Sequence, residues 1–103
     1  MVWLFAYGLL TDPATLRRLL GFLPEGRPAW LAGYRRRYSR RHGYYYLEPD
    51  QGAGARGVAW RLPETALPLL DDFEDVDAGL YRRVPVRITL EDGREVAGYA
   101  YEG

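Results

Sequence analysis

The pattern that most restricts the fold lies in the last quarter of the chain. Apolar and polar side chains alternate over residues 81–90 and again over residues 94–101, and Glu91-Asp92-Gly93 separates the two runs. Alternation with a period of two is typical of strands with one buried face, and Asp followed by Gly between such runs is a strong turn signal. The sequence therefore predicts a closing antiparallel hairpin, and with it a fold that contains a sheet.

A strand followed by a helix is predicted at the start of the chain. Residues 2–7 are rich in β-branched and aromatic side chains and end at a glycine, which is typical of a buried strand. Thr11-Asp12-Pro13 then supplies a helix cap and a proline suited to the first turn, and Gly21 supplies a stop. Three leucines between them recur at helical spacing and give one apolar face: Leu16, Leu19 and Leu20.

The middle of the chain predicts three further strand segments. Two of them are expected on either side of Gly43, within residues 27–47, and the third covers residues 57–62. The stretch Pro49-Asp50-Gln51-Gly52-Ala53-Gly54 has the composition of a turn and is predicted to be a loop.

A second helix is predicted to open at Pro63-Glu64-Thr65, with four expected buried positions: Leu67, Leu69, Leu70 and Phe73. The predicted order is then β-α-β-β-β-α-β-β with short connections. We expect one α+β domain over residues 1–103, in which two short helices pack against a mixed sheet or small β-barrel. A chain of this length is sufficient for a single hydrophobic core.

Composition excludes several kinds of site. The chain has no cysteine, which excludes disulfides, thiol nucleophiles and thiolate metal sites and favours a cytoplasmic location. The 14 basic residues are all arginine and balance 14 acidic residues, so there is no lysine to form a Schiff base. His42 is the only histidine, and we expect no metal. No apolar run approaches the roughly 20 residues that cross a bilayer, and residues 1–6 indicate a strand rather than a leader.

Three segments stand out for their order and separation. They are Phe5-Ala6-Tyr7-Gly8-Leu9-Leu10, Gly57-Val58-Ala59-Trp60, and Leu70-Asp71-Asp72-Phe73-Glu74 followed by Leu80-Tyr81-Arg82-Arg83. Together they resemble the gamma-glutamylcyclotransferase-like family, including its AIG2-like branch, over nearly the whole chain from Leu4 to Tyr101. The most specific part is the Leu-Asp-x-x-Glu segment with a tyrosine shortly downstream.

The resemblance implies a small β-barrel-like fold and an intramolecular reaction that releases 5-oxoproline from a gamma-glutamyl amine or peptide, without a cofactor. Carried over by position, Glu74 is the general acid/base. The turn after the first strand holds the substrate through backbone amides, Tyr81 lines the pocket, and Tyr99 is preferred to Tyr101 as the late pocket tyrosine. The implied substrate-binding residues are Tyr7, Gly8, Leu9, Leu10, Tyr81 and Tyr99.

The implied reaction suits a single carboxylate. The α-amine of the substrate must lose a proton before it attacks the γ-carbonyl, and the leaving amine must gain one. Acidic neighbours at Asp71, Asp72 and Asp75 are expected to raise the pKa of Glu74, with Asp71 one helical turn away. The turn departs from the family pattern in one place, because Leu9 stands where serine or threonine is usual, which removes a hydroxyl contact.

Two other functions are compatible with the residues. One is a non-catalytic protein of the same fold that binds a small ligand or a partner. The other is an RNA-binding module, because the basic run from Arg35 to His42 precedes three tyrosines, as in surfaces that bind single strands. The balanced net charge favours a charged strand face for this run. We therefore expect a small-molecule gamma-glutamyl substrate, no nucleic acid and no membrane, and we leave the oligomeric state open.

Overall fold

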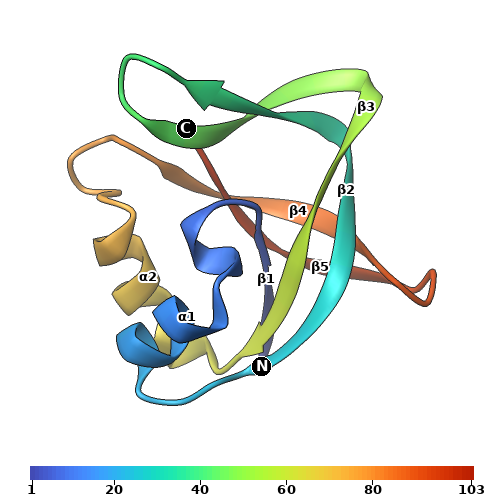
Figure 1. Cartoon of the computed structure of the whole chain (residues 1–103). Helices are drawn as coiled ribbons and strands as arrows, with labels where there is room; N and C mark the ends of the chain where they lie inside the picture. The colour runs from blue at the N-terminus through green and yellow to red at the C-terminus, as the bar shows by residue number, and fades with distance from the viewer.

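The computed structural model describes residues 1–103 and has five strands, two α-helices and two short 3-10 turns. The elements are β1 (Val2–Ala6), η1 (Leu9–Thr11), α1 (Pro13–Leu20), β2 (Glu25–Ser39), β3 (Tyr44–Leu62), η2 (Glu64–Ala66), α2 (Leu67–Phe73), β4 (Arg82–Leu90) and β5 (Glu95–Glu102). The strands form a closed barrel in the order β1-β3-β2-β4-β5 (Figure 1). All pairs are antiparallel except β1 with β5, which confirms the predicted α+β mixed barrel with two helices.

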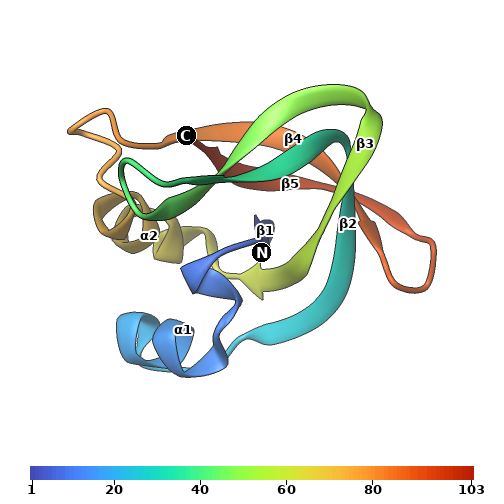
Figure 2. The same ribbon diagram turned by 45° about the horizontal axis from the view of Figure 1, so that its top comes forward.

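The buried side chains form two clusters because side chains alternate along each strand. In β1, Phe5 belongs to a cluster to which all five strands contribute, whereas Leu4 and Ala6 belong to a second cluster shared with the helices. Leu16 of α1 and Leu70 of α2 are completely buried in this second cluster. Both helices therefore cover one side of the barrel, and the tip of the β2–β3 hairpin reaches toward that side (Figures 1 and 2).

The local signals that delimit α1 act as the sequence predicts. The carboxylate of Asp12 caps the helix by accepting hydrogen bonds from the Ala14 amide at 3.4 Å and the Thr15 hydroxyl at 2.8 Å. Gly21 has a φ of 84°, a left-handed conformation that glycine adopts readily, and its amide donates to the Arg17 carbonyl at 2.8 Å. The predicted helix after the first strand is confirmed.

The predicted loop at residues 49–54 is wrong, because β3 continues through it. Ala32 pairs with Gly54 and Tyr34 pairs with Pro49, so residues 50–53 stand opposite Gly33 alone. This bulge lets the turn-forming residues bend the strand without ending it. The two strand segments predicted on either side of the loop are therefore one long strand, and the chain has five strands where six were expected.

The predicted burial of α2 is correct except at one position. Leu67 is 4% exposed, Leu70 is completely buried and Phe73 is half-buried, whereas Leu69 is 51% exposed. Residues three apart share a face of a helix, so 67, 70 and 73 point to the barrel together. Leu69 points away from that face because α2 packs against the barrel along a narrow stripe.

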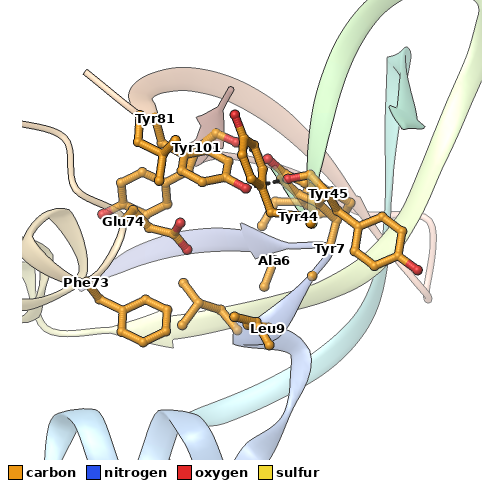
Figure 3. A pocket seen from close by; sticks show the side chains of 14 residues that line it. Ala6, Tyr7, Leu9, Tyr44, Tyr45, Phe73, Glu74, Tyr81 and Tyr101 are labelled. Atoms are coloured by element: carbon orange, nitrogen blue, oxygen red, sulfur yellow. Dashed lines mark hydrogen bonds between the residues drawn. The ribbon is translucent and has the colours of Figure 1, made fainter. Parts of the chain in front are cut away.

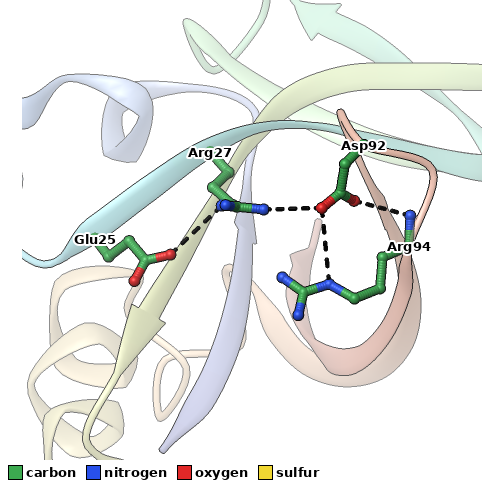
Figure 4. Close-up of polar contacts among 4 residues, drawn as sticks. All are labelled: Glu25, Arg27, Asp92 and Arg94. Atoms are coloured by element: carbon green, nitrogen blue, oxygen red, sulfur yellow. Dashed lines mark hydrogen bonds and ion pairs between the residues drawn. The ribbon is translucent and has the colours of Figure 1, made fainter.

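The barrel closes between β2 and β4 through a short seam. Only Ala29 with Leu90 and Trp30 with Thr89 are in register there, and the Glu91 amide adds a hydrogen bond to the Pro28 carbonyl at 3.0 Å. A chain of ion pairs lies beside this seam (Figure 4), comprising Glu25–Arg27 at 3.4 Å, Arg27–Asp92 at 3.1 Å and Arg94–Asp92 at 4.0 Å. These pairs are exposed and screened, so they fix the geometry of the seam more than they stabilise the fold.

Candidate active site

A cavity of about 240 Å³ lies where three parts of the chain meet: the turn after β1, the tip of the β2–β3 hairpin and the segment after α2 (Figure 3). Most of its lining is apolar or aromatic, with a single carboxyl group. The lining residues are Phe5, Ala6, Tyr7, Gly8, Leu9, Leu10, Gly43, Tyr44, Tyr45, Phe73, Glu74, Leu80, Tyr81 and Tyr101.

The structure brings most of the predicted site residues onto this one cavity. The residues found there are Glu74, Tyr7, Gly8, Leu9, Leu10 and Tyr81. The placement of Tyr99 at the pocket is wrong, because Tyr101 lines the cavity and the Tyr99 ring lies 5.2 Å from the Arg83 guanidinium instead. Residues two apart on a strand share a face, so both tyrosines point toward the helix side and only their position along β5 separates them.

Glu74 holds the only carboxyl group in the cavity. It follows the last turn of α2, where its amide donates to the Leu70 carbonyl at 2.9 Å, and its half-buried side chain points into the cavity (Figure 3). Burial, and secondarily the charge of Asp75, raises the pKa of this carboxyl from its ordinary value of 4.5 to about 7. The expected rise in pKa is therefore present, but its main cause is loss of water rather than the acidic neighbours.

Asp71 does not contribute to this rise in pKa, because it has partners of its own. Both of its carboxylate oxygens accept from the Arg83 guanidinium, at 3.0 and 3.2 Å, and one also accepts from the Tyr101 hydroxyl at 2.6 Å. The contacts of Asp71 with Arg83 and Tyr101 join α2 to β4 and β5. Asp71 thus holds the helix that carries Glu74 against the barrel, which sequence reasoning missed because Arg83 and Tyr101 are distant in the chain.

Tyr101→Phe tests this connection. We expect the free energy of unfolding to fall by about 1–3 kcal/mol, because the variant loses a hydrogen bond to a charged group. Tyr99→Phe is the matched control: the contact of Tyr99 with Arg83 is made by its ring, which the variant keeps, so the effect should stay within about 0.5 kcal/mol. Urea denaturation of both variants measures the difference, and equal stabilities would contradict the assigned role of Asp71.

In the turn after β1, the backbone carbonyl groups have hydrogen-bond partners within the chain, whereas several backbone N–H groups do not. The carbonyls of residues 7 to 10 accept hydrogen bonds from the Arg36 guanidinium at 3.1 Å, the Thr11 amide at 3.0 Å, the Asp12 amide at 3.2 Å and the Trp60 indole at 2.8 Å, respectively. The amides of Gly8, Leu9 and Leu10 donate none of the backbone hydrogen bonds found in the turns and loops. Unpaired N–H groups beside an apolar cavity are suited to hold a carboxylate or a developing oxyanion.

The phenol groups of the cavity are held by backbone carbonyls. The Tyr7 hydroxyl donates to the Tyr101 carbonyl, and the Tyr81 hydroxyl donates to the Tyr45 carbonyl. Burial raises the pKa of both Tyr7 and Tyr81 well above the ordinary value, so both stay neutral. The Tyr81 oxygen can therefore accept a hydrogen bond from a ligand, since its proton is already engaged, whereas the Tyr7 oxygen already has the Leu47 backbone as a partner.

The hairpin tip supplies a wall of the cavity that sequence reasoning missed. Gly43, Tyr44 and Tyr45 line the cavity, and the rings of Tyr44 and Tyr81 lie 5.3 Å apart. Phe73 and Leu80, beside the predicted base and tyrosine, complete this apolar lining. The run of three tyrosines after Gly43 was a usable signal, because aromatic side chains at a hairpin tip are unusual without a surface to cover.

Two arginines of the basic run form ion pairs across the hairpin. Arg35 pairs with Asp50 at 3.1 Å and Arg37 pairs with Glu48 at 2.8 Å. Arg36, on the opposite face, lies 4.5 Å from the Tyr45 ring centroid and donates to the turn after β1. These contacts favour a structural role over an RNA-binding one for residues 35–37, whereas Arg40 and Arg41 are exposed in the turn after β2.

No group of three or more His, Cys, Asp or Glu side chains is placed so that it could hold a metal ion. None of the helices has the length and apolar character needed to span a bilayer.

The fold and the site together define a class of small proteins: a closed barrel with one carboxyl group in an apolar cavity. The family model described as gamma-glutamyl cyclotransferase, AIG2-like, matches residues 4–103. The chain belongs to this family, and the resemblance seen in the sequence is confirmed.

Solved structures share the fold. The Arabidopsis thaliana protein At5g39720.1 is 25% identical, with a TM-score of 0.80 over 98% of this chain and 67% of its own. YkqA from Bacillus subtilis is 26% identical, with a TM-score of 0.85 over 98% of this chain and 39% of its own. An AIG2-like protein from Mus musculus is 23% identical, with a TM-score of 0.77 over 100% of this chain and 77% of its own.

The matched structures are mostly longer than this chain. It spans 61% to 67% of the length of four of them. A comparison with curated proteins gave no significant match.

Proposed function

We propose that this protein is an enzyme that cyclises gamma-glutamyl compounds, with Glu74 as its general acid/base, and releases 5-oxoproline and an amine. One observation carries the proposal: a carboxyl group with a pKa of about 7 shares an apolar cavity with a turn whose amides at Gly8 and Leu10 are unpaired. A base that titrates near neutral pH can both accept and return a proton under physiological conditions.

The reaction needs one proton to move between two nitrogen atoms. The neutral α-amine of the glutamyl group attacks its own γ-carbonyl carbon, which forms the ring C–N bond. The Glu74 carboxylate takes the proton that this nitrogen sheds and gives it to the leaving nitrogen as the original amide bond breaks. Because nucleophile and electrophile are in one molecule, the enzyme mainly has to hold the chain curled, and effective molarities in such cases reach about 10⁵ M or more.

The turn and the tyrosines supply the other contacts in this proposal. The unpaired amides of Gly8 and Leu10 hold the negative oxygen that develops on the γ-carbonyl or the substrate carboxylate. The neutral phenol oxygen of Tyr81 accepts from the α-amine, since its own proton already points to a carbonyl, and Tyr7 forms part of the cavity wall. An aromatic lining keeps bulk water from the reacting atoms.

A product assay tests the proposal directly. The protein is incubated with a panel of gamma-glutamyl dipeptides and gamma-glutamyl amines, and 5-oxoproline is separated and quantified by liquid chromatography. We expect catalytic release from at least one member of the panel. Saturable binding of the panel without any 5-oxoproline would show a non-catalytic pocket instead and would overturn the proposed activity.

The pH dependence of the reaction should report the pKa of Glu74. The carboxylate is the form that accepts the proton, so kcat/KM should fall as pH falls through about 7. The α-amine of the substrate itself loses its proton at about pH 8, so each rate is divided by the fraction of substrate with a neutral amine. In the corrected profile an ordinary, water-exposed glutamate would place this limb near its usual pKa of 4.5. Initial rates from pH 4 to pH 9 in buffers of constant ionic strength distinguish the two, and a profile flat between pH 5 and pH 8 contradicts the proposed role.

A further inference from the structure

Three exposed apolar side chains surround the opening of the cavity. Leu9 is 72% exposed, Tyr45 is 39% exposed and Leu80 is 38% exposed, yet all three line the same cavity as Glu74. They come from three different segments: η1, the start of β3 and the residues after α2. Large apolar side chains gathered at one hollow mark a surface that a ligand covers.

The polar groups of the cavity are concentrated in its deeper part. Tyr7 is buried and Glu74 is half-buried, whereas Leu9 is largely exposed. A glutamyl group, with its amine and carboxylate, is suited to the deeper part, where these polar atoms and the unpaired amides lie. The leaving amine is then left at the opening, against Leu9, Tyr45 and Leu80.

We infer that the preferred substrates carry an uncharged apolar or aromatic group on the leaving amine, and that Leu9, Tyr45 and Leu80 form its binding surface. This inference rests on the proposed function, because it assigns the part of the substrate that departs. An apolar group at this surface removes exposed leucine and tyrosine from water, whereas a cationic group there is desolvated without an anionic partner at the opening, because Glu74, the one carboxyl group of the lining, lies deeper.

A matched pair of substrates tests the inference. Gamma-glutamyl pentylamide and gamma-glutamyl 5-aminopentylamide have the same chain length and differ in a terminal ammonium group. We expect kcat/KM for the pentylamide to be at least about tenfold higher, since even one methylene group in an apolar pocket gives about 10- to 200-fold discrimination and an unpaired ammonium group is costlier to desolvate. Both values come from the same 5-oxoproline assay.

Three variants locate the effect. Leu9→Ser and Leu80→Ser should each bring the two kcat/KM values several-fold closer together, because each removes part of the apolar surface. Leu69→Ser, an exposed leucine of α2 outside the cavity, should leave the ratio unchanged.

The possible outcomes separate the two claims. Equal or reversed kcat/KM for the pair overturns the apolar leaving-group surface and leaves the cyclisation itself standing. An unchanged ratio in both Leu9→Ser and Leu80→Ser overturns the assignment of the surface to these residues. Failure to release 5-oxoproline from either compound or from the wider panel overturns the proposed function, and the inference with it.

Discussion

Glu74→Gln is expected to lower kcat/KM for 5-oxoproline release by about 10²- to 10⁴-fold, the usual contribution of a general acid/base. The amide keeps the size of the side chain and its place in the cavity but cannot carry the proton. Asp72→Asn is the matched control, since it neutralises an exposed carboxylate of the same helix outside the cavity and should leave kcat/KM unchanged. A kcat/KM of Glu74→Gln within threefold of that of the parent would falsify the assignment of Glu74 as the general acid/base.

The same variant has a distinct signature in stability. Burial raises the pKa of Glu74 in the folded chain to about 7, from 4.5, so folding favours the protonated form. The protonated carboxyl of Glu74 therefore contributes to the free energy of unfolding. This contribution is fully present below pH 4.5 and is lost as pH rises through about 7, because the buried group becomes charged. Glutamine carries no charge to bury. The free energy of unfolding of Glu74→Gln, relative to that of the parent, should therefore be higher at pH 8 than at pH 4.5. Urea denaturation of both proteins at these two pH values measures the difference.

Leu70→Ala is expected to lower the free energy of unfolding by about 2–5 kcal/mol. Leu70 is completely buried between α2 and the barrel, and its truncation leaves a cavity that the surrounding strands can only partly fill. A chain of this size has a total stability of about 5–15 kcal/mol, so this is a large fraction of it. Because Glu74 follows the same helix, catalytic activity should fall together with stability.

Leu69→Ala is the matched control for this prediction. It removes the same atoms from the neighbouring position, but Leu69 is exposed, so the free energy of unfolding should change by less than about 0.5 kcal/mol. Denaturant midpoints of the two variants, measured side by side, make the comparison. Equal losses would contradict the orientation of α2.

Local signals account for the part of the fold that the sequence predicted. The Asp12 cap and Gly21 stop delimit α1, and the Asp92-Gly93 turn separates β4 from β5, because each signal acts within a few residues of chain. The turn after β1 and Glu74 were assigned by resemblance to a family, and the structure brings them to one cavity. Their catalytic and binding roles stay predictions.

The features that were missed depend on contacts between distant segments. Residues 50–53 form a bulge inside β3 because β2 pairs on both sides of them, which their turn-like composition conceals. Asp71 was expected to act on Glu74, but Arg83 and Tyr101 engage it. Tyr101 reaches the cavity and Tyr99 does not, because they lie at different positions along β5. Alternation predicts only that the two share a face of the strand.

The hydrogen bond between Tyr7 and the Tyr101 carbonyl joins residues 94 positions apart. One wall of the cavity therefore belongs to the first strand and another to the last, and these strands meet through only two parallel register pairs. The lining residues run from Phe5 to Tyr101, so nearly the whole chain is needed to form the cavity. A ligand that needs both walls binds the closed barrel and not the unfolded chain, so its occupancy should report global folding in this protein.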